Sequence, residues 1–275
     1  MTGEPRPQEA ATPPTEARNP RAANLEALNA REVLELMNDE DATVPAAVNR
    51  AIPTIARATD AIVAAFAKGG RLRYVGAGTS GRLGVLDASE APPTFGVEPS
   101  FVHGMIAGGD GALRRSIEGA EDDALAGARE TREHVRADDV LVGISASGRA
   151  RYVIAALVMA REIGAHTVAL TCDPDSPLAA GADEAIVLDV GPEILAGSSR
   201  LKAGTATKLV LNMLSTASMI RSGRTRGDLM VDLRATNAKL RDRALRMVME
   251  VTGLGEGEAR ERLESNGWSV RKAIG

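Results

Sequence analysis

Apolar residues recur at helical spacing in the first part of the chain, over residues 24–39 and again over residues 44–67. Pro45 suits the first turn of the second helix, whereas Pro53 predicts a kink or a break within it. The glycine pair that follows Lys68 predicts its end. The chain therefore opens with two predicted helices.

After residue 70 the pattern changes to short apolar runs separated by helical segments. These runs predict strands at 71–75, 101–107, 139–144, 166–171 and 184–190. The segments between and after them predict helices at 80–90, 112–135, 151–164 and 205–222, the first of them stopped by Pro92 and Pro93. Nearly uninterrupted apolar strands are typical of a parallel sheet covered on both faces. We expect an α/β fold with a doubly wound five-stranded parallel sheet and flanking helices.

The two ends of the chain differ from this central part. Residues 1–20 are rich in Pro, Thr and Glu and predict a flexible or loosely docked tail. Residues 21–225 form the predicted α/β domain. Residues 226–275 predict a small helical region with a charged helix at 237–251 and two shorter helices. Leu263, Trp268, Val270 and Ile274 are expected to point inward, in an arrangement that resembles a ubiquitin-associated-like fold.

Composition excludes several classes of function. The formal net charge of −4 over 275 residues argues against a nucleic-acid surface, where a basic face is expected. No apolar run approaches the roughly 20 residues that a membrane helix needs, and the N-terminus lacks the apolar stretch of a secretory signal. Cys172 is the only cysteine, so no intramolecular disulfide can form. We expect a cytoplasmic protein that binds neither nucleic acid nor membrane, and an inert Cys172.

Two hydroxyl-rich turns follow the first and third predicted strands. They read Gly-Ala-Gly-Thr-Ser-Gly over 76–81 and Ser-Ala-Ser-Gly-Arg over 145–149. A turn between a strand and a helix exposes backbone N–H groups to an anion. Parallel strands present such turns at one edge of the sheet, where ligands bind. The alternative is that Ser145 and Ser147 only cap a helix.

A third Ser- and Gly-rich segment, residues 193–205, carries Arg200 and Lys202 and opens the last long helix. These two cations either offset a phosphate or lie on a solvated face. The absence of a Walker lysine favours a monophosphate ester over a nucleoside triphosphate. No cluster of His, Cys and acids has metal-ligand spacing, so neither a metal nor an organic cofactor is expected.

Carboxylates are the remaining candidates for proton transfer. Glu90 lies at the end of a predicted helix, in the sequence Asp-Ala-Ser-Glu-Ala-Pro-Pro. A second acidic group consists of Glu118, Glu121, Asp122 and Asp123, and Glu118 and Glu121 share a face of the predicted helix. From the residues alone, a solvated acidic surface is the favoured explanation for the second group, and it explains Glu90 as well as a catalytic role does.

Several longer segments resemble one family of enzymes. They are RNPRAANLEAL, LMNDEDATVPAAV, GAGTSGRLGVLDASEAPPTFG, IAGGDGAL, EGAEDD, SASGR, GPEILAGSSRLKAGTATKLVLNMLSTASMIRSG and LMVDLRATNAKLRDRA. In this order they are similar to N-acetylmuramic acid 6-phosphate etherases over about residues 16–252. The resemblance implies a sugar-isomerase (SIS) fold and a relationship to glucokinase regulatory proteins, which bind phosphosugars without turning them over.

What this resemblance implies is a carbon–oxygen lyase that works as a homodimer without a cofactor. Its substrate is N-acetylmuramic acid 6-phosphate from cell-wall recycling or scavenging. Water is consumed, and the products are N-acetylglucosamine 6-phosphate and D-lactate. Two other functions remain open. One is an aldose–ketose phosphosugar isomerase of the same fold, and the other is a sensor that binds a phosphosugar without turnover.

The resemblance also implies site residues. The family's proton donor falls on Glu90 and its second active-site acid on Glu121. Binding of the substrate phosphate falls on the two loops, at Gly78, Thr79, Ser80, Ser145, Ser147 and Gly148. The family's further ligands to sugar or phosphate fall on Glu193, Ser198 and Lys202. The chain departs from the family pattern at Ala150, usually Thr, and at Asp228, usually Asn. The missing hydroxyl at residue 150 removes about 1 kcal/mol of hydrogen bonding.

Overall fold

A five-stranded parallel sheet forms the centre of the molecule. The computed structural model describes residues 13–233, 235 and 237–275. The strands are β1 (Leu72–Gly76), β2 (Val102–Ile106), β3 (Val140–Ile144), β4 (His166–Thr171) and β5 (Glu184–Val187). Their order is β2-β1-β3-β4-β5, and every neighbouring pair is parallel. The fold class and the five predicted strands are confirmed.

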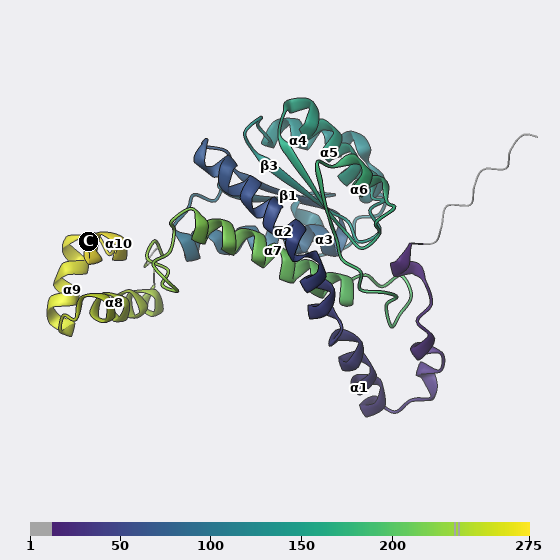
Figure 1. The fold of residues 1–275 in the computed structure, drawn as a ribbon, viewed down its shortest axis with the longest axis horizontal. Helices are drawn as coiled ribbons and strands as arrows, with labels where there is room; N and C mark the ends of the chain where they lie inside the picture. The colour runs from purple at the N-terminus through teal and green to yellow at the C-terminus, as the bar shows by residue number, and fades with distance from the viewer. Residues whose placement is uncertain (1–12, 234, 236) are drawn as a thin grey trace, which may run out of the picture.

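Helices cover both faces of this sheet (Figure 1). One layer contains α2 (Val44–Ala67), α3 (Gly78–Phe95) and α7 (Lys202–Arg221), and the other contains α4 (Ala124–His134), α5 (Arg151–Ile163) and α6 (Pro177–Gly181). Alternate strand residues enter the two layers: Leu72 and Tyr74 pack with the first, and Val75 with the second. Because both faces are covered, the middle strand β3 is buried and free of polar side chains, as the sequence indicates.

Two predicted helices differ from the structure around prolines and glycines. Helix α3 does not stop before Pro92 but continues to Phe95 and ends at Gly96, which has φ +64°. The backbone N–H of Gly96 bonds to the carbonyl of Pro92, so a left-handed glycine cap ends the helix after both prolines. Helix α2 likewise runs without a break through Pro53.

The predicted helix over 112–135 is wrong in its first half. Only Ala124–His134 is α-helical, and two short 3₁₀ turns, Asp110–Leu113 and Ala120–Asp122, precede it. Gly119 has φ +70°, a left-handed conformation that separates the second turn from the chain before it. The four acids of this segment therefore do not share a helix face.

Residues Thr15 and Asn19 of the N-terminal part of the chain bond to Gly197 and Pro192 of the sheet domain, whereas residues 1–12 of the expected tail lie outside the described residues. Short 3₁₀ turns lead into α1 (Ala30–Asp41), which begins at Asn29 rather than Asn24. The side chain of Asn29 accepts from the backbone N–H of Glu32, and Glu32 accepts from that of Asn29. This capping box explains where the helix begins.

The C-terminal helices α8 (Ala238–Thr252), α9 (Glu256–Ser265) and α10 (Val270–Ile274) bury an apolar cluster of their own. They lie at the opposite end of the molecule from the N-terminal segment (Figure 1). Leu263 and Val270 are fully buried there, and Trp268 and Ile274 pack against them. These side chains point inward as the sequence indicates.

A buried ion pair joins β1 to the start of β3 at the amino-terminal edge of the sheet. Arg73 Nε lies 3.3 Å from Asp139 Oδ2, and both side chains are almost fully buried. Arg73 also donates to the carbonyl of Ser100, and Asp139 accepts from the backbone N–H of Arg136. Removing one partner of such a pair costs about 3–5 kcal/mol because the other charge stays buried.

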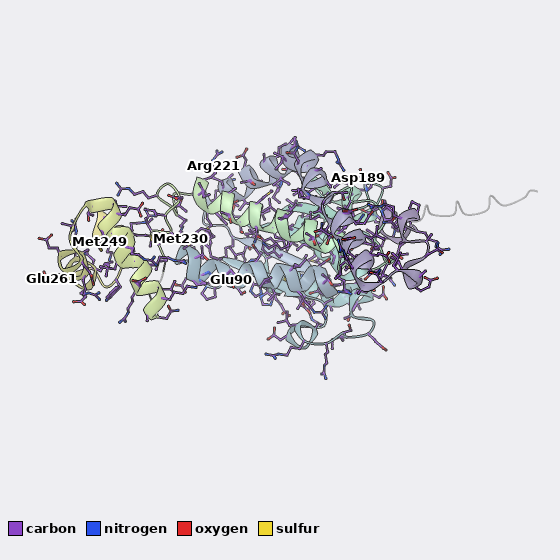
Figure 2. The ribbon with its side chains drawn as sticks, turned by 90° about the horizontal axis from the view of Figure 1, so that it is seen from below. Glu90, Asp189, Arg221, Met230, Met249 and Glu261 are labelled. Carbon is purple, nitrogen blue, oxygen red and sulfur yellow. The ribbon has the colours of Figure 1, made fainter. Side chains whose placement is uncertain are left out.

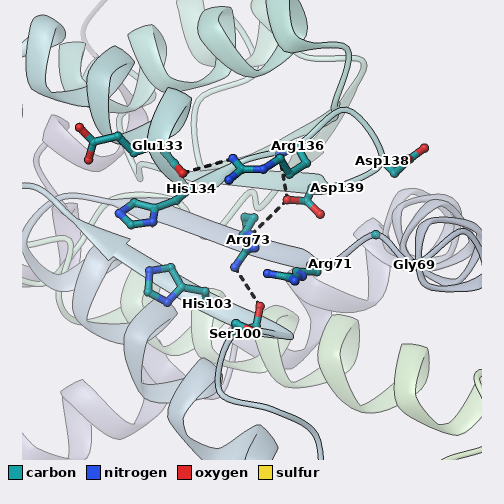
Figure 3. Close-up of a pocket in the computed structure, with 11 residues that line it drawn as sticks. Gly69, Arg71, Arg73, Ser100, His103, Glu133, His134, Arg136, Asp138 and Asp139 are labelled. Carbon is teal, nitrogen blue, oxygen red and sulfur yellow. Dashed lines mark hydrogen bonds and ion pairs between the residues drawn. The ribbon is translucent and has the colours of Figure 1, made fainter.

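The same edge has a cavity of about 370 Å³ in which His103 and His134 lie with ring centroids 5.4 Å apart (Figure 3). Burial and then the charges of Arg73 and His134 lower the pKa of His103 below that of an exposed histidine. The unfolded chain therefore binds this proton more readily than the folded chain does. The contribution of neutral His103 to stability is complete above the unfolded pKa and is lost as pH falls through the lowered folded pKa.

We therefore predict that the His103→Asn variant loses less stability in acid than the unmodified protein. The free energy of unfolding in denaturant, measured at about pH 7.5 and about pH 5.5, spans the titration of a free histidine. The free energy of unfolding is expected to decrease less between the higher and the lower pH in the variant than in the unmodified protein. Equal decreases in both proteins would contradict the assignment.

Candidate active site

A polar cavity lies at the carboxyl-terminal edge of the sheet, between the loops that follow β1 and β3. The two strands are neighbours, and Gly76 is paired with Ile144 at their ends. The cavity measures about 290 Å³. Five of the predicted site residues line it, together with residues of the N-terminal segment and of the loop before α7: Thr79, Ser80, Ser145, Ser147 and Glu121, with Thr15, Glu16, Gly197 and Ser199.

The first loop brings the beginning of α3 directly against β1. A side chain at Gly76 or Gly81 would collide with the backbone of the other residue, so two glycines allow this close approach. The N-cap residue of α3, Ala77, makes no side-chain capping bond. The first N–H groups of the helix therefore remain available beside the hydroxyls of Thr79 and Ser80, an arrangement that favours an anion.

The second loop carries two hydroxyls that do not cap the following helix. The N-cap residue of α5 is Ala150, which makes no side-chain capping bond. Ser147 Oγ instead accepts from the N–H of Arg149 within the loop, and Ser145 donates its N–H to Leu170 of β4. The capping alternative therefore fails for both serines, and both line the cavity.

Glu121 belongs to the 3₁₀ turn before α4, at the rim of this cavity. Asp123 caps α4 by accepting from the N–H of Ala126 at 2.9 Å. Among the described acids of the second acidic group, Glu121 alone lines the cavity. The structure thus places Glu121 at the cavity and its three acidic neighbours away from it, a difference that the sequence did not indicate.

Two of the predicted ligands have structural partners instead. Glu193 is completely buried and accepts from the backbone N–H groups of Lys202 and Ala203, each at 2.9 Å, so it caps α7. Lys202 Nζ lies 2.6 Å from Glu40 Oε2. Glu193, Lys202 and Ser198 are not among the residues that line the cavity, although Gly197 and Ser199 beside Ser198 are.

The buried partner of Lys202, Glu40, was not recognised from the sequence. Burial alone would raise the pKa of Glu40, but the hydrogen bond and charge of Lys202, with Asn19 and Arg21, lower it. Thr15 and Glu16 were missed as well, because a Pro- and Thr-rich segment indicates a tail rather than part of a site. The only signal in this region was the segment RNPRAANLEAL, which begins next to them.

Glu90 lies in a different cavity from Glu121. Ten residues of α3 separate it from Ser80, a length of about 15 Å at the helical rise. Its cavity of about 280 Å³ is lined also by Asp87, Asn212, Asp228 and Met230. Figure 2 shows Glu90 near Met230, toward the end of the domain that faces the C-terminal helices. One copy of the chain does not bring the two predicted catalytic acids together.

A buried carboxyl group lies one helical turn before Glu90. Asp87 accepts from Tyr74 at 2.9 Å, from Asn212 at 2.8 Å and from Ser215 at 3.2 Å. Burial raises the pKa of Asp87 although these three donors oppose the shift. Because these bonds join α3 to β1 and α7, they fix the part of α3 that carries Glu90.

The comparisons with known proteins agree on the class of protein. The chain is 56% identical over 261 residues to N-acetylmuramic acid 6-phosphate etherase of Brucella anthropi, which covers 94% of this chain and 85% of that protein. It is 52% identical to the etherase of Yersinia pestis, covering 94% and 88%. Residues 54–161 match the glucokinase regulatory protein N-terminal SIS domain family, and residues 123–217 match the SIS domain family.

The chain belongs to the N-acetylmuramic acid 6-phosphate etherase family.

Solved structures outside the etherase family share its fold. An Escherichia coli protein in complex with A5P superposes with a TM-score of 0.53 at 20% identity, over 73% of this chain and 97% of that one. A phosphoheptose isomerase from Neisseria gonorrhoeae gives 0.52 at 20% identity, over 69% and 98%. These similarities show a shared fold, in agreement with the match to the SIS domain family. They carry no information on which reaction this chain catalyses.

The surroundings of Cys172 do not favour a reactive thiolate. Cys172 is buried, and burial followed by the charges of Glu193 and Asp189 raises its pKa to about 12. Across residues 13–233, 235 and 237–275, no group of three or more His, Cys, Asp or Glu residues is placed to hold a metal ion. Among the same residues, no helix is long and apolar enough to cross a membrane.

The second loop depends on Gly148, which leads to a test. Gly148 has φ +64°, and a Cβ there would lie 2.2 Å from Ser176 Oγ, a buried side chain that caps α6. Gly78 has φ +53° but open space around it. We predict that Gly78→Ala loses about 1–2 kcal/mol of unfolding free energy from its conformation alone, and that Gly148→Ala loses more. Denaturant unfolding measures both variants, and equal losses would contradict the steric argument.

Proposed function

We propose that the protein cleaves the D-lactyl ether of N-acetylmuramic acid 6-phosphate with water, yielding N-acetylglucosamine 6-phosphate and D-lactate. The observation that carries this proposal is the polar cavity at the carboxyl edge of the sheet, in a chain of this family. Two hydroxyl-bearing loops and two helix N-termini without side-chain caps face one small volume. Such an arrangement suits a phosphate monoester.

The proposed reaction is an elimination followed by hydration. Opening of the sugar ring makes C1 an aldehyde and the C2 proton acidic. Loss of that proton and breakage of the C3–O bond release lactate, whose ether oxygen takes up a proton. Water then adds its hydroxyl to C3 and a proton to C2. The elimination and the hydration together are redox-neutral and need two positioned proton-transfer groups.

We assign these roles to Glu90 as proton donor and Glu121 as the second acid. Because they line separate cavities in one chain, the proposal requires a second copy to present Glu90 to the cavity that holds Glu121. Apolar side chains near Glu90 support a homodimer: Leu86, four residues before it, and Ile220, in its cavity, are about half exposed. We propose that this dimer acts in the cytoplasm.

The proposal is tested by D-lactate release from N-acetylmuramic acid 6-phosphate in a buffer that contains a chelator. Stoichiometric D-lactate and N-acetylglucosamine 6-phosphate are expected. Thermal stabilisation by N-acetylglucosamine 6-phosphate without any lactate release would instead indicate a phosphosugar sensor. Conversion of the substrate to a ketose would indicate an isomerase.

The shared site gives a prediction for mixed dimers. Glu90→Gln and Glu121→Gln are each expected to abolish lactate release while the fold is retained. Co-refolding the two variants restores one complete site in each mixed dimer, and random pairing then gives about a quarter of the unmodified activity. Each variant refolded alone is the control. A mixture that stays inactive would contradict a site shared between subunits.

The phosphate loops give a second prediction. The Ser145→Ala, Ser147→Ala double variant loses two hydroxyls that face the cavity. Because hydrogen bonds to a charged group contribute about 1.5–3 kcal/mol each, we expect KM to rise at least about tenfold while kcat changes less. Steady-state lactate release measures both constants. An unchanged KM would place the phosphate elsewhere.

A further inference from the structure

The N-terminal segment, residues 13–29, forms one wall of the phosphosugar cavity. Thr15 is 1% exposed, and its carbonyl accepts from the N–H of Gly197 at 2.9 Å. Thr15 and Glu16 line the cavity with both hydroxyl loops and Glu121. Thr15 and Glu16 are therefore constituents of the site, although they lie at least 60 residues before the first loop in sequence.

A network of polar contacts holds this segment in place. Asn19 donates to Glu40 Oε2 at 2.9 Å and to the carbonyl of Pro192 at 3.4 Å. Arg21 pairs with Glu40 at 3.1 Å, and Glu40 pairs in turn with Lys202. Since Asn19, Glu40 and Lys202 are all buried, the segment is anchored to the first turn of α7. The backbone beside Glu16 thus has a defined position.

The side chain of Glu16 points at the loop before α7. A Cβ on Gly197 would lie 2.7 Å from Glu16 Oε2, so the carboxylate rests against the backbone of this glycine. The backbone N–H of Glu16 bonds to the carbonyl of Pro13, but within the part of the chain that the structure describes its carboxylate has no hydrogen-bond or ion-pair partner. A carboxylate only accepts hydrogen bonds, so its acceptor sites are free for donors on a ligand.

We propose that Glu16 binds the sugar part of the substrate by accepting hydrogen bonds from its hydroxyl or amide donors. A phosphate at pH 7 carries negative charge and few donors, and it is repelled by a carboxylate. The hydroxyls and helix N-termini of the two loops suit the phosphate, which leaves Glu16 and Glu121 to face the sugar. This inference rests on the proposed function, and it makes Glu16 a specificity-determining residue for a hexose phosphate.

The test compares two ligands on the full chain. Isothermal titration gives the Kd of N-acetylglucosamine 6-phosphate and the Kd of inorganic phosphate for the unmodified protein and for Glu16→Gln. Loss of a charged acceptor is expected to weaken the sugar phosphate about tenfold or more. Binding of inorganic phosphate should be unchanged or tighter, because a negative charge is removed. Glu26→Gln, an exposed acid on the same segment, serves as the control and should bind both ligands normally.

Two outcomes would overturn the inference. The first is an unchanged Kd for the sugar phosphate in Glu16→Gln. The second is equal weakening of both ligands, which would mean that the substitution displaces the segment rather than removing a sugar contact. Lactate release by the unmodified protein is measured separately, so that the proposed reaction and this inference can fail independently. If binding depends on Glu16 but no lactate is released, the proposed reaction alone is rejected. If lactate is released but Glu16→Gln binds the sugar phosphate normally, this inference alone is rejected.

Discussion

The candidate site exists because the connections leaving β1 and β3 run to opposite faces of the sheet. Helix α3, after β1, packs with α2 and α7, whereas α5, after β3, packs with α4 on the other face. The two loops therefore diverge at the strand ends and leave a crevice between them, as parallel α/β sheets do where the strand order reverses. This crevice brings the hydroxyls of the two loops, which are far apart in the sequence, to one cavity.

The N-terminal segment and the loop before α7 complete the walls of that crevice. Glu193 caps α7 from within the protein, and Lys202 is held by Glu40 of α1. Charges that the sequence offers as substrate ligands are used here to join three distant parts of the chain. A buried charge needs a partner at close range, and no one-dimensional pattern says which partner it will have.

The sheet and the positions of the two hydroxyl-rich loops could be predicted from the sequence because both depend on local signals. Apolar runs and glycine-rich turns gave all five strands and placed Thr79, Ser80, Ser145 and Ser147 at one edge. The prediction of helix ends failed at individual prolines and glycines. Helix α3 continues through Pro92 and Pro93 to its left-handed cap at Gly96, and Gly119, in a left-handed conformation, interrupts a segment whose composition suits a helix.

The position of Glu90 could be predicted from its motif only in part. The motif sets it on α3, but only the length of that helix shows that it lies far from Glu121 in one chain. The bonds from Asp87 to Tyr74, Asn212 and Ser215 hold the helix against the sheet domain, so a shift of α3 within the subunit is disfavoured. The proposed second subunit would bring the two acids to one substrate without such a shift.

The central claim is that a carbon–oxygen bond on the sugar side is broken by elimination and replaced by water. Turnover of N-acetylmuramic acid 6-phosphate in water labelled with oxygen-18, followed by mass spectrometry of both products, tests it directly. The account predicts that the label enters the C3 hydroxyl of N-acetylglucosamine 6-phosphate and that the bridging ether oxygen of D-lactate stays unlabelled. Label in that oxygen of lactate, with none at C3, would mean attack at the lactyl carbon and would contradict the account.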